Sequence, residues 1–421
     1  MKRITLILLF SGLIHLHAQI VSDARKIIDT LTSPYMNGRG YVGEGVEHAA
    51  TYIRSEFELA GLKKFNNTYN QHFKLNINTF PDTISLKVNE TVLVPGKDFI
   101  VEAGAAPARG KYKLIPIDSN FIQSESKMKK FYAHENKDAF LLVNKETFGS
   151  KNFELLLAYL KQTNGLNTAG LIELVNTKLT MDIAQEQNQF THLIILQSEF
   201  PTDASTVEMV IESELKKYYK TANIIGLVEG AKTDSFLVLT AHYDHLGQLG
   251  NGAYFPGAND NASGIAMLIE LARYFTNPEN KPAYSILFIA FAGEEPGLVG
   301  SKYFTENPLI DLKKIKFLLN MDIMGTGDDG IKVVNGAVYT NEFNRLVAIN
   351  DAKQYLKSVQ PRGKAANSDH YFFTEKGVPA FFIYTLGGIA AYHDINDKAE
   401  TLPLTDFEDL FHLIIDFENS F

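Results

Sequence analysis

The 421-residue sequence contains no cysteine and no tryptophan. The absence of cysteine excludes a disulfide framework, an iron–sulfur cluster, a thiolate zinc site, a thiol nucleophile and a lipid-modified N-terminal cysteine. Any bound metal must therefore be held by His, Asp and Glu side chains. Beyond the N-terminus the sequence also lacks an apolar run long enough to cross a bilayer. We therefore expect a protein that is not integral to a membrane.

Basic residues are in the minority. The chain has 40 Lys and Arg against 49 Asp and Glu, for a formal net charge of −9 at pH 7. This balance argues against nucleic acid or an anionic membrane as the main partner. The composition, 45% hydrophobic and 21% charged, is that of a globular protein and not of a disordered, collagen-like or coiled-coil chain. The length predicts two or three domains, or one large domain with an insertion.

The N-terminus has the features of a secretory signal. Lys2 and Arg3 precede an apolar stretch over residues 4–16, and Ala18 is a small residue suited to cleavage. A buried N-terminal helix is the alternative interpretation. We expect residues 1–18 to be a signal peptide and the mature protein to be exported, to the periplasm or out of the cell.

The pattern of apolar residues changes between residues 22 and 219, from helical spacing to short strand-like runs. Residues 22–62 predict two helices around a glycine-rich turn at 37–40. Residues 73–219 carry short alternating or apolar runs with turn residues between them, and one helical stretch at 152–161. No two of these runs end in acidic residues or histidines. We therefore expect residues 73–219 to form a mostly-β insertion.

From residue 223 onward, apolar strands alternate with helices. This alternation is typical of an α/β fold with a mainly parallel sheet covered by helices on both faces. We expect residues 19–72 and 220–421 to form one discontinuous catalytic domain, divided by the insertion.

An imidazole or a carboxylate follows the expected strands of this sheet. Ligands in open α/β sheets bind at the carboxyl ends of the strands, so these positions test for a site. Such side chains follow four strands and occupy one loop, all at one edge of the sheet. Chance placement of His, Asp and Glu would not give this pattern. The residues are His242 and Asp244 after 235–240, Asp260 in the loop that follows, Glu294 and Glu295 after 284–291, Asp322 after 317–319, and His393 beyond 379–384.

Several carboxylates at one edge disfavour one another's ionisation, and two divalent cations would relieve that repulsion. Oxygen and imidazole ligands without sulfur suit zinc, with cobalt or manganese as alternatives. If Asp260 bridges, one ion takes His242 and Asp322, and the other takes Glu295 and His393. Each ion then has three protein ligands and keeps open positions, as a catalytic site needs. The sequence thus predicts two zinc ions per chain.

Five motifs resemble those of the co-catalytic di-zinc aminopeptidases of the bacterial leucyl aminopeptidase and aminopeptidase Y type, in peptidase clan MH. The resemblance covers residues 223–421 and the N-terminal helices with Gly38-Arg39, and residues 73–219 resemble a degenerate protease-associated insertion. The motifs, in the family's order, are His242-x-Asp244, Gly257-Ala258-x-Asp260-Asn261-Ala262-Ser263-Gly264, Glu294-Glu295-x-Gly297-Leu298-x-Gly300-Ser301, Asn320-Met321-Asp322 and Tyr392-His393.

The resemblance implies an aminopeptidase that hydrolyses the N-terminal peptide bond of peptides with a free N-terminus, with two zinc ions activating a bridging water. It makes Glu294 the general base, which takes a proton from that water and passes it to the leaving amine. It has Asp244 hold His242 by its other ring nitrogen, and Tyr392 stabilise the oxyanion. The implied metal ligands are His242, Asp260, Glu295, Asp322 and His393.

Other interpretations stay open. The scaffold could carry a single-zinc, glutaminyl-cyclase-like acyltransferase, a carboxypeptidase, or a metal-free binding module, although the complete ligand set favours the peptidase. Asp260 could serve only to cap a helix. We expect His245 to be structural, and His370 to be structural or to line the substrate pocket. The sequence predicts no particular oligomeric state or N-terminal residue preference.

Overall fold

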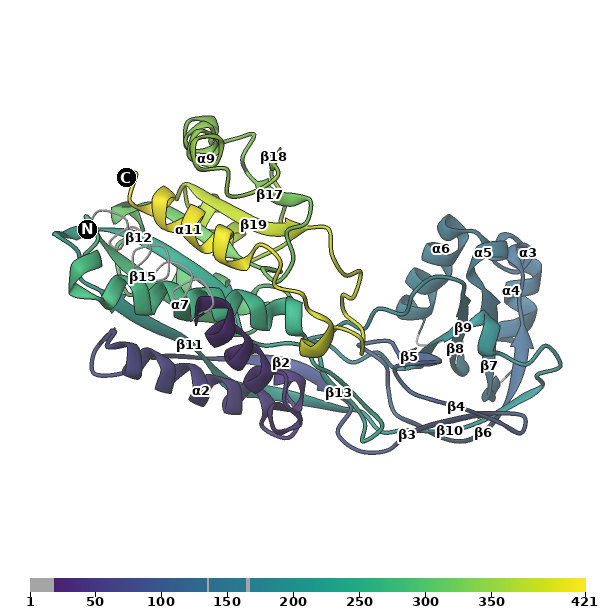
Figure 1. Ribbon diagram of the computed structural model, residues 1–421. Helices are drawn as coiled ribbons and strands as arrows, with labels where there is room; N and C mark the ends of the chain where they lie inside the picture. Colours follow the sequence, from purple (N-terminus) through teal and green to yellow (C-terminus); the bar gives the residue numbers. More distant parts are fainter. Residues whose placement is uncertain (1–18, 135, 164–166) are drawn as a thin grey trace.

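The computed structural model describes residues 19–134, 136–163 and 167–421, and its chain forms two units, each built on one large sheet (Figure 1). The expected signal peptide, residues 1–18, lies outside the described residues. No helix among the described residues is long and apolar enough to cross a membrane.

The first unit contains a nine-stranded sheet in the order β1-β11-β15-β12-β16-β19-β17-β18, with β2 paired to β11. Its four central strands, β15, β12, β16 and β19, are parallel, as the sequence predicts. The margins differ from that prediction, because β11 and β17 each pair antiparallel with a central strand. The strands are β1 (Lys63–Lys64), β2 (Asn70–Thr79), β11 (Glu214–Val228), β12 (Lys232–His242), β15 (Tyr284–Phe291), β16 (Ile315–Met321), β17 (Gly330–Val334), β18 (Val359–Arg362) and β19 (Ala380–Leu386).

Helices cover both faces of this sheet, which confirms the predicted α/β class (Figure 1). Seven of the eight residues of β15 are buried, as expected for a strand packed on both sides. Helices α2 (Gly45–Ala60), α7 (Gly264–Thr276) and α11 (Phe407–Glu418) pack on one face. Helices α8 (Val299–Glu306) and α10 (His370–Glu375) pack on the other, through Phe304 and Phe373. Helix α9 (Thr340–Lys353) lies against α11.

The second unit has an eight-stranded sheet in the order β4-β3-β10-β6-β7-β8-β9-β5. The four strands from β6 to β9 are parallel to one another. The strands are β3 (Ile84–Val88), β4 (Thr91–Leu93), β5 (Phe99–Val101), β6 (Ala108–Pro116), β7 (Asn136–Asn144), β8 (Thr168–Val175), β9 (Thr191–Leu196) and β10 (Thr206–Ile211).

Helices are more numerous in the second unit than the sequence predicts. Besides α6 (Ser150–Gln162), which was expected, the unit has α3 (Ser119–Gln123), α4 (Glu125–Tyr132) and α5 (Lys145–Phe148). The prediction of a mostly-β segment is therefore corrected to a mixed α/β unit. The three added helices are short and begin at side-chain caps, Asp118, Ser124 and Asn144, so apolar periodicity does not reveal them.

Strands β2 and β11 place the boundary of the second unit. Both belong to the nine-stranded sheet, where they pair antiparallel from Asn70–Ile224 to Thr79–Glu214. The boundaries expected at residues 73 and 219 thus fall inside strands of the first unit. We propose residues 80–213 as the inserted unit, and its resemblance to a protease-associated domain stays a prediction.

The carboxyl group of Glu418, at the end of α11, is buried without compensation. The residue is 4% exposed, and neither carboxyl oxygen has a hydrogen-bond partner among the described residues. Burial raises the pKa of Glu418 to about 8, from an ordinary value of 4.5. The folded state therefore binds a proton that the unfolded state has lost, so this group reduces stability as pH rises from about 4.5 to about 8.

We predict that Glu418→Gln raises the free energy of unfolding at pH 8 by about 2–4 kcal/mol, since one pKa unit corresponds to about 1.4 kcal/mol. The gain should shrink toward pH 5, where the carboxyl is largely neutral in both states. Urea denaturation at the two pH values measures it, with the exposed Glu400→Gln as a control. An equal gain at both pH values would contradict this account.

Candidate metal centre

The structure brings the expected site residues together at the carboxyl edge of the parallel strands. His242 is the last residue of β12, Asp322 directly follows β16, and Glu294 and Glu295 lie just beyond β15. Asp260 lies in the helical turn Ala258–Ser263, which leads into α7. His393 and Tyr392 lie in the loop that follows β19.

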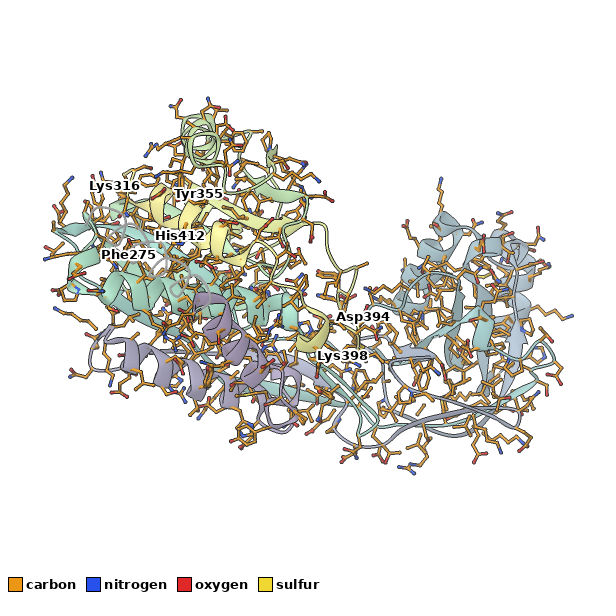
Figure 2. The ribbon with its side chains drawn as sticks, viewed as in Figure 1. Phe275, Lys316, Tyr355, Asp394, Lys398 and His412 are labelled. Atoms are coloured by element: carbon orange, nitrogen blue, oxygen red, sulfur yellow. The ribbon has the colours of Figure 1, made fainter. Side chains whose placement is uncertain are left out.

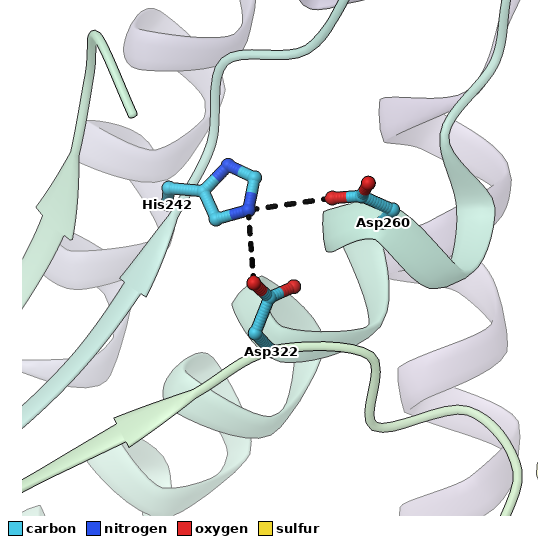
Figure 3. A group of neighbouring side chains, drawn as sticks. All are labelled: His242, Asp260 and Asp322. Atoms are coloured by element: carbon cyan, nitrogen blue, oxygen red, sulfur yellow. Dashed lines mark ion pairs between the residues drawn. The ribbon is translucent and has the colours of Figure 1, made fainter. Parts of the chain in front are cut away.

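Two carboxylates converge on His242. Its Nε2 lies 3.3 Å from Oδ1 of Asp260 and 3.5 Å from Oδ2 of Asp322 (Figure 3). The three residues are between 2% and 7% exposed. They form one of two groups in the described chain whose donor atoms are close enough to hold one metal ion.

A second cluster shares Asp260 with the first. Nε2 of His393 lies 3.1 Å from Oδ2 of Asp260 and 3.2 Å from Oε2 of Glu295. Asp260 therefore turns one carboxylate oxygen toward His242 and the other toward His393. This is the arrangement that a carboxylate bridging two metal ions requires.

The two imidazoles are held in the same tautomer. Nδ1 of His242 donates to the backbone carbonyl of Asp244 at 3.1 Å, and Nδ1 of His393 donates to that of Met181 at 2.9 Å. A carbonyl only accepts, so each Nδ1 carries a proton and each Nε2 lone pair can face a metal. Oδ1 of Asp322 is also buried and has no hydrogen-bond partner in the part of the chain that the structure describes.

The carboxylates of both clusters favour positive charge at the two imidazoles. Although burial opposes it, Glu294 and Asp322 hold the pKa of His242 well above its ordinary value. Burial likewise opposes the shift at His393, whose pKa is raised by Glu295 and by hydrogen bonds to neighbouring carboxylates. Protons or metal ions can supply this charge. Because the nitrogen and oxygen donors converge and one buried oxygen lacks a partner, the residues fit a pair of divalent ions.

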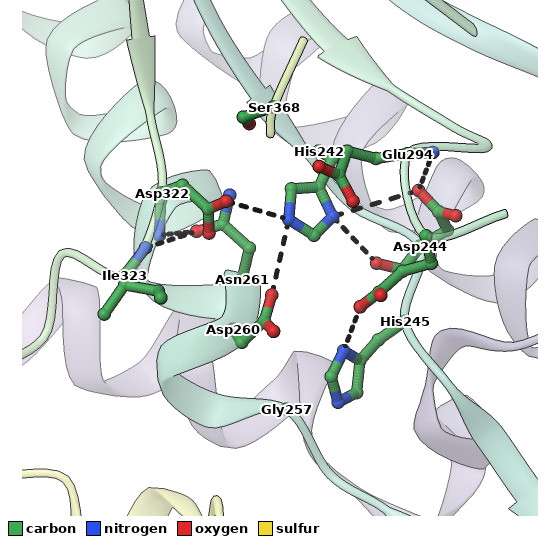
Figure 4. Close-up of polar contacts among 12 residues, drawn as sticks. His242, Asp244, His245, Gly257, Asp260, Asn261, Glu294, Asp322, Ile323 and Ser368 are labelled. Atoms are coloured by element: carbon green, nitrogen blue, oxygen red, sulfur yellow. Dashed lines mark hydrogen bonds and ion pairs between the residues drawn. The ribbon is translucent and has the colours of Figure 1, made fainter. Parts of the chain in front are cut away.

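Asp244 holds His242 by its other ring nitrogen, as the resemblance implies, and does so through its backbone. Its carboxylate Oδ1 lies 3.9 Å from Nδ1 of His242, too far for a hydrogen bond, and its backbone carbonyl makes that bond instead (Figure 4). The carboxylate accepts from the backbone N–H of Glu294 at 3.2 Å and from the hydroxyl of Tyr41 at 2.9 Å. Asp244 thus fixes both His242 and the loop that carries Glu294.

Glu294 and Tyr392 face a pocket of about 150 Å³ beside the clusters. Burial raises the pKa of Glu294 well above its ordinary value, and the charges of Asp369 and Glu295 add to the shift. Tyr392 is 46% exposed and stacks on His393, with 4.0 Å between the ring centroids. The other pocket-lining residues are His242, Asp260, Asp322, Ile323, Asn367, Phe382, Tyr384 and His393.

His245 has a closer relation to the site than expected. It is fully buried, and its Nδ1 lies 2.7 Å from Oε1 of Glu295. With Asp260 and Glu295 it forms the second group whose donor atoms could hold a metal ion. Its position three residues after His242 was the feature of the sequence that could have placed it at the site. His370, in contrast, is fully buried outside the pocket-lining set and packs against Phe382.

Arg39 holds the backbone of two of the segments that bear site residues, the one after β12 and the one that leads to Asp260. Its guanidinium is fully buried and donates five hydrogen bonds of 2.6–3.1 Å, each to a carbonyl group. Burial lowers the pKa of Arg39 to about 10, against the opposing charges of Asp260 and Asp397. The sequence pointed to Arg39 only through the family resemblance. The carbonyl groups belong to Leu31, Tyr243, Pro256, Gly257 and Asp260.

The family model and the relatives that match this chain are all peptidases. Residues 223–417 match the family model of peptidase family M28. The chain is 37% identical over 127 residues to a probable zinc metalloprotease of Pyricularia oryzae, which is 29% of this chain and 25% of that protein. It is 32% identical over 166 residues to aminopeptidase YwaD of Bacillus subtilis, which is 37% of this chain and 34% of that protein. The matches thus span about a quarter to a third of these relatives.

The solved structure of BSAP, a zinc aminopeptidase from Bacillus subtilis, resembles the whole chain. The TM-score is 0.68 at 19% sequence identity, over 94% of this chain and 93% of that one. The likeness shows that the two proteins share their fold across both units.

We predict that Arg39→Met lowers the free energy of unfolding by about 3–5 kcal/mol, because it removes a buried charge and leaves five carbonyl groups without their donor. Urea denaturation measures the loss. Arg109→Met is a suitable control, since Arg109 makes an exposed ion pair with Glu212 and its loss should cost under about 1 kcal/mol. Equal stability of Arg39→Met and the wild type would refute the role of Arg39.

Proposed function

We propose that this chain, whose residues 223–417 belong to peptidase family M28, is an exported metallo-aminopeptidase that removes N-terminal residues from peptides with a free N-terminus. One observation carries the proposal more than any other. The two oxygens of Asp260 face two separate imidazoles, His242 and His393, within 3.3 Å.

Two zinc ions would be held by the two clusters. His242, Asp260 and Asp322 would bind one ion, and Asp260, Glu295 and His393 the other. Nitrogen and oxygen donors of this kind suit zinc, and cobalt or manganese could replace it. A bound metal pair supplies Lewis acidity, which polarises the scissile carbonyl and makes water more acidic.

Glu294 is the proposed general base. It lines the pocket beside both clusters, and Asp244 fixes its backbone N–H at 3.2 Å. In this role its carboxylate takes a proton from the attacking water and then gives it to the leaving amine.

Tyr392 is the proposed donor to the oxyanion of the tetrahedral intermediate. Its hydroxyl stays protonated and can donate a hydrogen bond to developing negative charge. Its ring is almost parallel to that of His393, with 13° between the planes. The orientation of Tyr392 therefore depends on the same loop as a proposed metal ligand.

A panel of aminoacyl-anilides tests the function. We predict that the protein cleaves anilides with a free α-amine, that it leaves their N-acetyl forms intact, and that a chelator removes the activity until zinc is restored. Glu294→Gln should lower kcat by about 10²–10⁴-fold, the usual contribution of a general base, while retaining its metal.

The exposed Glu306→Gln is the matched control and should keep full activity. Full activity of Glu294→Gln would refute the proposed base. Failure to cleave any free-amine substrate by the zinc-loaded protein would instead favour an acyltransferase, a carboxypeptidase or a binding module.

Export is proposed from Lys2, Arg3, the apolar residues 4–16 and Ala18. We predict that the mature protein begins at Gln19 and is found in the periplasm or the medium. N-terminal sequencing of protein isolated from the producing cells measures this. A retained Met1 in cytoplasmic protein would contradict it.

A further inference from the structure

A segment of the inserted unit lies against the candidate metal centre. Residues 178–185, between β8 and β9, are without regular secondary structure. Leu179 and Met181 are 7% and 3% exposed and belong to the core of the inserted unit. Ile183 packs against this core and also against that of the first unit. The 178–185 segment is thus anchored at both sides of the junction.

Met181 and His393 make a reciprocal pair of hydrogen bonds. The backbone N–H of Met181 donates to the carbonyl of His393 at 2.9 Å, and Nδ1 of His393 donates to the carbonyl of Met181 at 2.9 Å. The pair fixes both the backbone and the ring of His393. His393 has a φ of 52°, a left-handed conformation that a residue with a side chain keeps only where its surroundings hold it.

Lys178 fixes the same loop on both sides of His393. Its ammonium lies 2.5 Å from Oδ2 of Asp394 and donates to the carbonyl of Ala390 at 2.8 Å. Asp394 lies at the junction of the two units (Figure 2). Its side chain is 9% exposed, so the ion pair is partly shielded from water. The other oxygen of Asp394 accepts from the backbone N–H of Asn396 at 2.7 Å.

The 178–185 segment also reaches the loop that carries the proposed base. The side-chain amide of Gln185 donates to the carbonyl of Pro296 at 2.7 Å, directly after Glu294 and Glu295. One segment of the inserted unit therefore contacts two of the three loops that supply ligands to the second cluster, those of Glu295 and His393.

We propose that the 178–185 segment is part of the metal centre and that Lys178 is a positioning residue for His393. The inference rests on the proposed function, because it assigns His393 to one of two metal ions. The Met181 carbonyl keeps the proton of His393 on Nδ1, and so leaves Nε2 free for the metal. Lys178 holds the loop in the place where this bond forms. Partners of metal-ligating histidines of this kind typically contribute 10–100-fold in metal affinity or activity.

Cobalt titration of the full-length, metal-free protein tests the proposal, because the visible absorption of Co²⁺ reports each site as it fills. We expect Lys178→Met to weaken the binding of one of the two ions by about tenfold and to leave the other unchanged. Lys178→Arg should restore most of the affinity, since it keeps the charge and the hydrogen-bond donors. In the zinc-loaded protein, kcat should fall for Lys178→Met with little change in KM.

Asp394→Asn should reproduce part of the effect, because Lys178 keeps its bond to the carbonyl of Ala390. The double variant should lose no more than Lys178→Met alone, since that substitution already removes both contacts. Lys113→Met is the matched control. Lys113 lies in the same unit and makes an exposed ion pair with Asp138, at 2.9 Å.

The outcomes separate this inference from the proposed function. Fewer than two ions bound by the wild-type protein would refute the proposed function itself. Two ions bound by the wild type, with an unchanged titration for Lys178→Met, would overturn the positioning role. Equal weakening of both ions together with a lower Tm would also overturn it, because that result describes a general loss of structure.

Discussion

Buried negative charge at one edge of the nine-stranded sheet is the constraint on which the rest of this structure depends. Asp244 is fully buried and Asp260 and Asp322 nearly so, and Glu294 and Glu295 lie beside them. Like charges this close cannot all persist without compensation. Arg39 supplies one fixed positive charge, but its five donors are all committed to backbone carbonyls. Two divalent ions would balance the carboxylates that remain.

The sequence predicts which side chains lie together at the sheet edge, because their positions follow local rules. Parallel strands end at a common edge, so the residues after β12, β15 and β16 had to lie near one another, and the structure places them there. The antiparallel margins were missed because pairing direction at a sheet edge depends on chain connections and not on apolar pattern. The extra helices of the inserted unit were missed because their caps, such as Asp118, are short-range signals without an apolar stripe.

The contact between Met181 and His393 could not be predicted from the sequence. The bond is to a backbone carbonyl, which every residue has, and it joins positions 212 apart in the sequence. Asp244 holds His242 by its other ring nitrogen, as the resemblance implies, but the sequence could not show that its backbone carbonyl makes the bond. The two cores are also interlocked, because Leu246, Leu249 and Phe255 of the first unit pack in the core of the second. The inserted unit is therefore structurally joined to the site, in a fold that BSAP shares across both units.

Anomalous X-ray diffraction from crystals of the zinc-loaded protein, recorded on both sides of the zinc absorption edge, tests the central claim most directly. The account predicts two zinc peaks about 3.5–4 Å apart, the spacing of a two-metal hydrolytic site. Asp260 should lie between them, with His242 at one peak and His393 at the other. A single peak, or two peaks of which only one contacts Asp260, would contradict the account.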